Sequence, residues 1–378
     1  MKKNQIILAL TSLLVLGLQS CRKEKMPLKE EVEQIFKGDA NASPKGMYIL
    51  NEGNMNSNKA SLDFVDFTTG IYKRNFYGTV NPEISLGLGD VGNDITIYGS
   101  KMYVVVNISN KVEVLDAKTG KKIKHIDLLN GRYVISHKGK VYVSAYLGKV
   151  GDPQSPKGIV AEIDTTSLSI TRKVEVGRQP EEMAIIEDRL YVANSGGYSP
   201  SDYENTVSVV DLNTFAETKR IEVAINLQRL KADAYGDLYV SSRGDYYSIQ
   251  AKLFVIDTRT DQIKKTFDIG VSDMVIHGDK AYVCGTEWSY IKGENIITYN
   301  TINVKDETLL NKSFITDGTD SKIIMPYGIT INPQTGDIFI ADAKDYLNPG
   351  KIYCFNANGQ FKWSAVTGDI PRYFAFLY

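Results

Sequence analysis

Few residues in this sequence have the side chains and spacing of a catalytic centre. The three histidines, His125, His137 and His277, are far apart and lie in strand or turn patterns. Glu181 and Glu182 are adjacent, but neighbours along a strand point to opposite faces, so they cannot work as one carboxylate pair. The sequence contains no nucleophile, zinc or phosphate-loop motif. It therefore predicts a binding protein that is not an enzyme and has no catalytic residue, metal or cofactor.

Side chains suited to binding are concentrated in long polar segments between strand-like runs. Residues 194–206, "NSGGYSPSDYENT", separate "RLYVA" from "VSVVDL" and carry two tyrosines. Loops between β-strands usually have about 2–5 residues. Tyrosine offers a flat contact area and a polar tip at low entropic cost. Long loops of this composition on a rigid scaffold therefore predict a ligand-contacting surface.

A repeated pair of strands must position these loops. The first strand of each pair is centred on an aromatic residue, and the seven centres are Tyr48, Tyr103, Tyr142, Tyr191, Tyr239, Tyr282 and Phe339. The second strand ends in a turn-forming polar residue, and the seven ends are Asp66, Asp116, Asp164, Asp211, Asp257, Asn300 and Asn356. By subtraction, these ends are 50, 48, 47, 46, 43 and 56 residues apart. A repeat of strands at this spacing predicts an all-β, seven-bladed β-propeller with four-stranded blades.

The polar residue at the end of each second strand has a structural role in this interpretation. An Asp or Asn side chain can accept the backbone N–H two residues further on and so close a tight turn. The next strand, as in "KKIKHIDL" or "TKRIEV", alternates Lys with apolar residues, which is typical of a half-exposed outer strand protected against pairing with other chains. These acids are therefore expected to form turns.

The two ends of the chain are expected to close the ring together. Six segments have the pattern of an inner strand that opens a blade, and the C-terminal "IPRYFAFLY" follows an outer strand without a blade of its own. We expect residues 370–378 to pair with the N-terminal blade within "GMYILNEG". Such a closed ring leaves no free sheet edge.

The propeller topology places the long segments on one face. The loop between the second and third strands and the crossover to the next blade share a face, whereas short hairpins such as "YGSK" and "HGDK" occupy the other. The long segments are "NEGNMNSNKAS", "AYLGKVGDPQSPKG", "NSGGYSPSDYENT", "SRGDYYSIQAK", "GTEWSYIKGEN" and "ADAKDYLNPGK". Together with the crossovers they are expected to enclose one pocket around the axis. The predicted ligand-binding residues are Asn51, Asn54, Asn93, Asp94, Arg132, Tyr133, Tyr146, Tyr198, Tyr203, Gln228, Arg229, Arg243, Tyr246, Tyr247, Trp288, Tyr290, Tyr327, Tyr346, Arg372 and Tyr373.

The N-terminus has the features of an export signal. Lys2 and Lys3 precede the apolar run "IILALTSLLVLGL", and "LQSC" follows it, which resembles a bacterial lipoprotein signal except for Gln19. The resemblance implies removal of residues 1–20 and lipidation of Cys21; the alternative is a plain secretory signal cut near Ser20. Residues 21–44 are expected to be a flexible tether with a short helix around "EEVEQIF", and residues 45–378 to be the propeller.

Composition excludes several other classes of function. Lys plus Arg (44) balances Asp plus Glu (45), for a net charge of −1, so no basic field attracts nucleic acid. Tyrosine is abundant, with 23 Tyr against 13 Phe and 2 Trp. Cys284 and Cys354 lie in apolar strands and are expected to be buried thiols, although an exported protein also allows a disulfide between them.

The aromatic-centred repeat resembles the YncE-like seven-bladed propellers of bacterial surface-layer proteins. With the lipoprotein signal and the Tyr-, Asn- and Gly-rich loops, the chain is also similar to the Bacteroidetes surface propellers that capture vitamin B12. That resemblance implies an outer-membrane, surface-exposed lipoprotein that binds cobalamin and passes it to a TonB-dependent transporter. The protein would be monomeric apart from the transporter. A corrinoid is a broad ring with amides at its rim and a phosphate on its nucleotide tail, which Arg132, Arg229 or Arg372 could bind.

Two other functions fit the same residues. Aromatic platforms with Asn and Arg also suit a glycan, so the chain could be a glycan-binding accessory lipoprotein of a sugar import system. A surface adhesin could use the whole loop face and would bury more than about 1,000 Å² against a protein partner.

Overall fold

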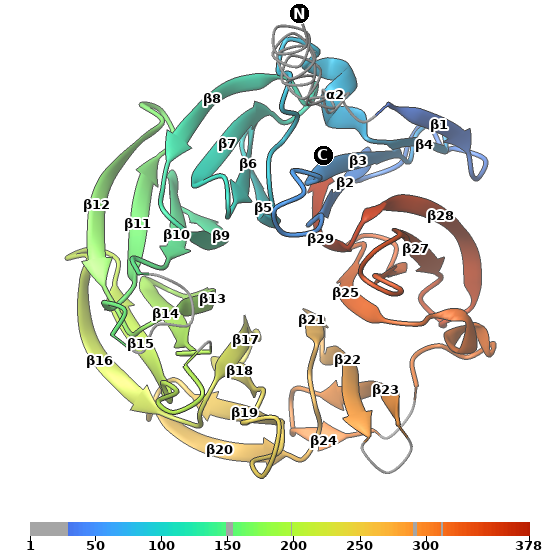
Figure 1. Cartoon of the computed structure of the whole chain (residues 1–378). Helices are drawn as coiled ribbons and strands as arrows, with labels where there is room; N and C mark the ends of the chain where they lie inside the picture. The colour runs from blue at the N-terminus through green and yellow to red at the C-terminus, as the bar shows by residue number, and fades with distance from the viewer. Residues whose placement is uncertain (1–28, 149–153, 198, 290–292, 311–312) are drawn as a thin grey trace, which may run out of the picture.

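Seven antiparallel sheets surround a central axis, and each sheet is one blade of a closed ring (Figure 1). The computed structural model describes residues 29–148, 154–197, 199–289, 293–310 and 313–378. The predicted seven-bladed β-propeller is confirmed. The predicted signal peptide and the lipidation residue Cys21 lie outside the described residues.

The blades follow one another along the chain, with the first strand of each next to the axis. Blade 1 consists of β29 (Pro371–Leu377), β2 (Gly46–Asn51), β3 (Ser61–Asp66), β4 (Ile71–Arg74) and β1 (Glu31–Gln34). Blade 2 consists of β5 (Gly92–Tyr98), β6 (Lys101–Val106), β7 (Lys111–Asp116) and β8 (Lys122–Asp127). Blade 3 consists of β9 (Gly131–His137), β10 (Lys140–Ala145), β11 (Ile159–Asp164) and β12 (Ser169–Glu175). Blade 4 consists of β13 (Pro180–Ile186), β14 (Arg189–Asn194), β15 (Thr206–Asp211) and β16 (Ala216–Glu222). Blade 5 consists of β17 (Leu227–Ala232), β18 (Asp237–Ser242), β19 (Lys252–Asp257) and β20 (Gln262–Phe267). Blade 6 consists of β21 (Asp273–His277), β22 (Lys280–Ser289), β23 (Glu294–Asn303) and β24 (Thr308–Leu309). Blade 7 consists of β25 (Pro326–Ile331), β26 (Ile338–Asp342), β27 (Pro349–Phe355) and β28 (Phe361–Asp369). The described helices, α2 (Phe76–Val80) and the short 3-10 helix η1 (Thr319–Lys322), lie in crossovers between blades, and neither is long and apolar enough to span a membrane.

The chain ends close the ring as predicted. β29 pairs with β2 in antiparallel register from Gly46↔Leu377 to Asn51↔Pro371. In Figure 1 the red β29 lies beside the blue β2 and β3 of blade 1. The backbone hydrogen bonds of this ladder join the two ends of the chain and give blade 1 an inner strand, as in every other blade.

Part of the predicted tether belongs to the propeller. Residues 31–34 form the outer strand β1, which pairs with β4, so the predicted short helix around "EEVEQIF" is wrong. A helix this short is marginal in water, whereas the edge of β4 offers unpaired backbone groups. Phe36 then stacks on Trp363 of β28 with ring centroids 5.4 Å apart. The segment therefore crosses the seam between blades 1 and 7.

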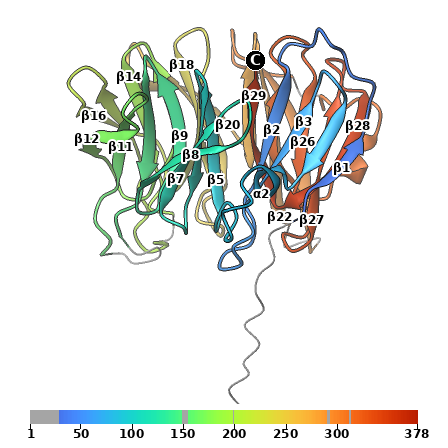
Figure 2. The same ribbon diagram turned by 90° about the horizontal axis from the view of Figure 1, so that it is seen from above.

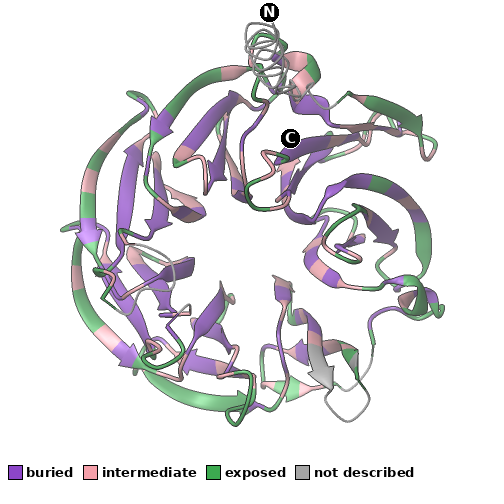
Figure 3. Ribbon diagram, in the orientation of Figure 1, coloured by how far each residue is buried: buried purple, intermediate pink, exposed green. Residues whose placement is uncertain are grey.

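The hydrophobic core lies between neighbouring blades. One cluster, for example, joins Val105 and Val114 of blade 2 to Val143 and Ile163 of blade 3. The inner strands are mostly buried and the outer strands mostly exposed (Figure 3). Cys284 and Cys354 are buried free thiols in different blades.

The repeated side chains have the roles expected of them. The aromatic centres are buried, apart from the half-buried Tyr282. In six blades the predicted terminal Asp or Asn accepts the N–H two residues further on. In blade 6 the prediction of Asn300 is wrong: β23 continues to Asn303, which accepts the N–H of Lys305 at 3.0 Å. The register differs because "NIITYNTIN" offers both Asn300 and Asn303 as the end of the strand.

One face of the disc, which we call the loop face, carries the connections between second and third strands and the crossovers (Figure 2). Contacts between them include the amide of Asn54, which donates to the carbonyl of Tyr346, and the N–H of Asn226, which donates to the carbonyl of Glu204. The opposite face carries short turns such as 138–139 and 187–188. The predicted long loop "GTEWSYIKGEN" is instead mostly ladder, because Gly285–Ser289 pair with Glu294–Thr298. Its β-branched residues favour pairing over an open loop.

Three carboxylates join the inner strands of neighbouring blades. Asp94 accepts the N–H of Val134 at 2.8 Å, Glu182 that of Leu230 at 2.9 Å and Asp273 that of Ile329 at 3.0 Å. These bonds join blades 2 to 3, 4 to 5 and 6 to 7. Burial and, to a smaller extent, the charge of Glu182 raise the pKa of the Asp94 carboxyl from 3.8 to about 7. Hydrogen bonds from backbone N–H groups lower this pKa but do not outweigh burial.

Deletion of residues 371–378 should prevent cooperative folding, because it removes the inner strand of blade 1 and exposes the buried residues of β2. Circular dichroism during heating and limited proteolysis measure this. Deletion of Tyr378 alone, which lies beyond β29 and is exposed, is the control and should leave the melting temperature unchanged. A shortened chain that melts cooperatively near the wild-type temperature would show that closure is dispensable.

Asp94→Asn should flatten part of the pH dependence of stability. In the folded protein the carboxyl keeps its proton up to about pH 7, whereas the unfolded chain releases it near 3.8. The wild type therefore loses stability relative to the variant as the pH rises from about 4 to about 7. Because Asp94 is partly exposed and lines the axial cavity, solvent access should reduce the effect, and we expect a relative loss of about 2 kcal/mol rather than the full value of about 4 kcal/mol. Urea unfolding at several pH values measures the difference, and parallel pH profiles would contradict the assignment.

Candidate ligand-binding site

A cavity of about 630 Å³ opens on the loop face, beside the axis. It is lined by residues of blades 5, 6, 7 and 1, so it lies to one side of the ring. The lining residues are Gln228, Arg243, Tyr246, Tyr247, Ile249, Gln250, Ala251, Gly270, Val271, Ser272, Thr286, Asn295, Met325, Tyr327, Tyr346 and Arg372. Aromatic, amide and guanidinium groups dominate this lining, and none of these residues has a carboxylate, imidazole or thiol.

Seven of the predicted ligand-binding residues meet in this cavity. They are Gln228, Arg243, Tyr246, Tyr247, Tyr327, Tyr346 and Arg372. They come from the 243–251 and 343–348 loops and from the first residues of β17, β25 and β29. Closure of the ring is what brings Arg372, near the end of the chain, next to the loops of blades 5 and 7.

One wall of the cavity is an arginine–tyrosine stack. The guanidinium of Arg372 lies 3.9 Å from the centroid of the Tyr327 ring. Tyr346 meets Tyr327 edge to face, with centroids 5.2 Å apart. Nη1 of Arg372 donates to Oε1 of Glu52 at 2.9 Å. Stacking and the ion pair together fix the plane of the guanidinium.

The facing wall contains a second arginine and a tyrosine group. Nη2 of Arg243 donates to Oδ1 of Asn226 at 2.8 Å and lies 3.8 Å from Oε1 of Glu181. Tyr246 and Tyr247 line the cavity, whereas Tyr203, whose pKa is raised by burial and by the neighbouring Tyr246, does not. Asn226 and Glu181 thus fix the guanidinium of Arg243, and Tyr246 and Tyr247 form the tyrosine surface of this wall.

Two loops of similar sequence present Tyr246 and Tyr346 in the same way. Each tyrosine follows an aspartate, and each has a left-handed backbone, with φ 65° and 60°. Oδ1 of Asp245 accepts three backbone N–H groups at 2.8 Å, and Oδ1 of Asp345 accepts two, at 2.9 and 3.0 Å. Bulky residues seldom adopt this conformation. The turns therefore hold both tyrosines in a backbone state that favours a ready-made contact surface.

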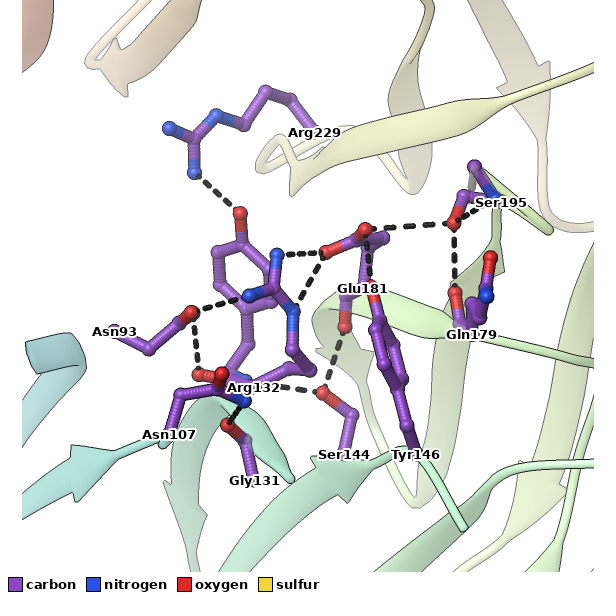
Figure 4. A network of polar contacts seen from close by, with 12 residues as sticks. Asn93, Asn107, Gly131, Arg132, Ser144, Tyr146, Gln179, Glu181, Ser195 and Arg229 are labelled. Carbon is purple, nitrogen blue, oxygen red and sulfur yellow. Dashed lines mark hydrogen bonds and ion pairs between the residues drawn. The ribbon is translucent and has the colours of Figure 1, made fainter. Parts of the chain in front are cut away.

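Behind the second wall, Glu181 is the centre of a buried polar network (Figure 4). Its side chain is fully buried, and it accepts hydrogen bonds from Nη2 of Arg132 at 2.9 Å and from the Tyr146 hydroxyl at 2.6 Å. Burial alone raises the pKa of Glu181, but the charges of Arg132 and Arg243 outweigh it and lower the pKa overall. The network thus fixes the position of Arg243.

The other predicted residues lie elsewhere. Arg132, Tyr146 and Asn93 belong to the Glu181 network and not to the cavity surface, because the crossovers of blades 2 to 4 pack their polar groups inward. Asn51 is fully buried, and its amide donates to Ser61 within blade 1. Asn54 and Tyr203 lie next to cavity residues without lining it. Tyr198 and Tyr290, and the side chain of Trp288, lie outside the described part of the chain.

Asp94, Tyr133, Arg229 and Tyr373 line a second, axial cavity of about 260 Å³. Their side chains follow the inner strands below the loop face. Arg372 lines both cavities and marks the boundary between them. Among the described residues, the predicted single pocket is therefore divided into at least two regions of different size that share Arg372.

Several cavity residues were not predicted. Thr286 and Asn295 were predicted to lie in an open loop. Their pairing between two strands could not be predicted, because the segment "GTEWSYIKGEN" shows no clear alternation of apolar and polar residues. Met325 precedes an inner strand, and Ile249 follows the second tyrosine of "DYYSI". Ile249 and Gln250 had a signal, because both lie in the predicted long loop "SRGDYYSIQAK". Glu52, which pairs with Arg372 but does not line the cavity, also lies in a predicted long loop, next to Asn51 and Asn54.

Glu181→Gln should destabilise the fold by about 3 kcal/mol at pH 7, because it leaves Arg132 and Arg243 buried without their carboxylate. Urea unfolding measures the loss. Glu175→Gln, which removes an exposed pair with Lys157 at 2.9 Å, is the matched control and should cost less than about 0.5 kcal/mol. Equal losses in the two variants would contradict a stabilising role for Glu181.

Solved structures with the same architecture have little sequence in common with this chain. A quinonprotein alcohol dehydrogenase-like protein from Bacteroides thetaiotaomicron has a TM-score of 0.62 and 15% identity, over 88% of this chain and 78% of that chain. Hydrazine synthase from Kuenenia stuttgartiensis has a TM-score of 0.57 and 15% identity, over 71% and 77%. The WD40 domain of Pan2 from Neurospora crassa has a TM-score of 0.52 and 12% identity, over 74% and 80%. At such identities these likenesses concern the fold alone.

No curated protein matches the sequence. The family described as "Domain of unknown function (DUF5074)" matches residues 45–373, and the chain therefore belongs to that family.

Proposed function

We propose that this protein is a lipid-anchored surface protein that binds a corrinoid on its loop face and passes it to a TonB-dependent outer-membrane transporter. One observation carries the proposal: a cavity lined by four tyrosines and two arginines is built on a closed, rigid ring. Binding and release, with no bond made or broken, are the proposed activity.

The chemistry of the cavity suits a broad ring with polar edges. Tyr246 and Tyr346 offer flat surfaces from two facing loops, and each is set by its own aspartate turn. Gln228, Gln250 and Asn295 supply amide groups that can pair with the amides at a corrin rim. A corrinoid is larger than the cavity, so part of it would lie at the mouth, next to the exposed Tyr247 and Ile249.

The anchor and the partner form the second half of the proposal. The Lys2–Lys3 start, the apolar run and Cys21 support lipidation and a place at the outer membrane. Exposed Met55, Leu147, Tyr247 and Leu347 lie in four connections of the loop face. Such tips are suited to a protein partner. A transporter that bound there would meet the ligand at its site of capture.

Calorimetry of the full chain in detergent with cyanocobalamin tests the proposal, and we expect one site per chain. Tyr246→Ala and Tyr346→Ala should each weaken binding about 30-fold, because each removes a buried aromatic contact of about 2 kcal/mol. Tyr235→Ala, which removes an exposed tyrosine from a hairpin on the opposite face, is the control and should bind like the wild type.

Two results would overturn the proposal. The first is no heat and no co-elution with cyanocobalamin; heat on addition of oligosaccharides would then favour a glycan-binding protein. The second is unchanged binding by both cavity variants, which would place the corrinoid elsewhere.

A further inference from the structure

We propose that Arg372 binds an anionic group of the ligand at the floor of the loop-face cavity. The group is a singly charged oxyanion, and for a corrinoid it is the phosphodiester of the nucleotide tail. This inference rests on the proposed function for the identity of the ligand but not for the existence of the anion site.

The hydrogen-bonding capacity of Arg372 is largely unused. Its side chain is 7% exposed and lines both cavities. A guanidinium has five N–H donors, yet among the described residues only Nη1 donates, to Glu52. Nε is buried without a partner. Unpaired donors of a buried charged group are costly, so a ligand oxygen that accepts from this guanidinium would be stabilising.

The surroundings fix which part of the guanidinium a ligand can reach. Tyr327 covers one face of the group at 3.9 Å. Glu52 occupies Nη1. The donors that remain are those of the edge, which is the part of an arginine that pairs with phosphate or carboxylate oxygens. The tyrosine thus acts as a support, and the site is shaped before a ligand arrives.

The other arginines have fewer free donors or do not line this cavity. Nη2 of Arg229 is also buried without a partner, but Arg229 lines the axial cavity. Arg229 is 1% exposed and lines only the axial cavity, where Nε donates to the carbonyl of Ser272 at 3.0 Å and lies 3.3 Å from Asp273. Arg132 pairs with Glu181 outside the cavity. Arg243 does line the cavity, but its guanidinium is held by Asn226 and Glu181. Arg372 is therefore the cavity arginine with the most donors left for a ligand.

The local charge favours one negative charge. Glu52 balances Arg372, and Asp273 lies beside Arg229. Burial and the charge of Arg372 both lower the pKa of Arg229. The charges of neighbouring groups, of which Asp273 is the largest contributor, outweigh these two effects, so the pKa of Arg229 is raised overall. The guanidiniums of Arg229 and Arg372 both lie against the Tyr373 ring, 5.9 and 5.3 Å from its centroid, so both would gain from an anion between the loop face and the axial cavity. A doubly charged anion would instead meet the repulsion of Glu52.

The backbone leaves room for this site. A Cβ on Gly328 of β25 would lie 2.0 Å from the carbonyl oxygen of Arg372. In blades 3, 5 and 7, one N–H of the inner strand donates to a carboxylate of the preceding blade. The residue just before that N–H is Tyr133 in blade 3, Arg229 in blade 5 and Gly328 in blade 7. The glycine of blade 7 lets β25 and β29 approach closely. At this one position of β25 no side chain lies beside Arg372, and the neighbour that blade 7 does provide is the ring of Tyr327, which covers one face of the guanidinium.

Two corrinoids, one with and one without the anionic phosphodiester, test the inference. Cyanocobalamin carries one phosphodiester, and dicyanocobinamide has the same ring without phosphate or nucleotide. Arg372→Gln should weaken binding of cyanocobalamin about 30- to 100-fold, the loss expected for a charged hydrogen-bonded pair. Binding of dicyanocobinamide should change less than about 3-fold. Arg372→Lys keeps the charge without the planar fork and should lie between the two.

The controls separate a binding role from a structural one. Arg259→Gln, an exposed arginine on the opposite face, should leave binding of both corrinoids unchanged. Melting temperatures of all variants show whether the ring is intact. Equal weakening of both corrinoids by Arg372→Gln would make Arg372 a structural support and would overturn the inference.

The inference also has a test that does not depend on corrinoids. If the wild type binds neither corrinoid, the proposed function fails, and inorganic phosphate at mildly acidic pH, where the singly charged H2PO4− predominates, becomes the probe for the anion site. Phosphate should then raise the melting temperature of the wild type but not of Arg372→Gln, relative to chloride at equal ionic strength. The same response in both proteins, or none in either, would remove the anion site.

Discussion

The pairing of β29 with β2 is the interaction on which the rest of the structure depends. It converts a row of sheets into a ring, and it places Pro371–Leu377 on the axis beside residues that precede them by more than 300 positions. Without it, Arg372 would not reach Tyr327, and Glu52 would face no cation. One ladder of backbone hydrogen bonds thus both stabilises the fold and assembles one wall of the candidate site.

Buried polar contacts complement this closure. Hydrophobic clusters hold neighbouring blades together, but apolar contacts are non-directional and fix register weakly. The carboxylates Asp94, Glu182 and Asp273 each accept one hydrogen bond from a defined backbone N–H of the next blade. Glu181 forms ion pairs with two arginines from different blades. Such groups cost free energy to bury. In return, they specify how the inner strands align, and so where the loop face presents its tyrosines.

The fold could be predicted from the sequence because its signals are local and repeated. Aromatic-centred strands recur at a nearly constant spacing, and each Asp turn depends on residues only two positions away. β1 was missed because four exposed residues carry no strand pattern and pair only because β4 has a free edge. The residues that meet at the candidate site were predicted in part. Predicted residues of the 243–251 and 343–348 loops line the cavity, but Tyr146 and Tyr246 have the same composition signal and different positions. One turns inward to Glu181 and the other takes a left-handed turn into the cavity, a choice made by tertiary contacts.

The central claim is that ring closure builds one ligand site from the loops of blades 5 and 7 and the start of β29. Hydrogen–deuterium exchange with and without cyanocobalamin tests it most directly, because it reports protection along the whole backbone. The account predicts slower exchange in residues 243–251, 325–327, 343–348 and 371–373 and no change in the hairpins of the opposite face. Protection of those hairpins, or of the loops of blades 2 to 4 alone, would contradict it.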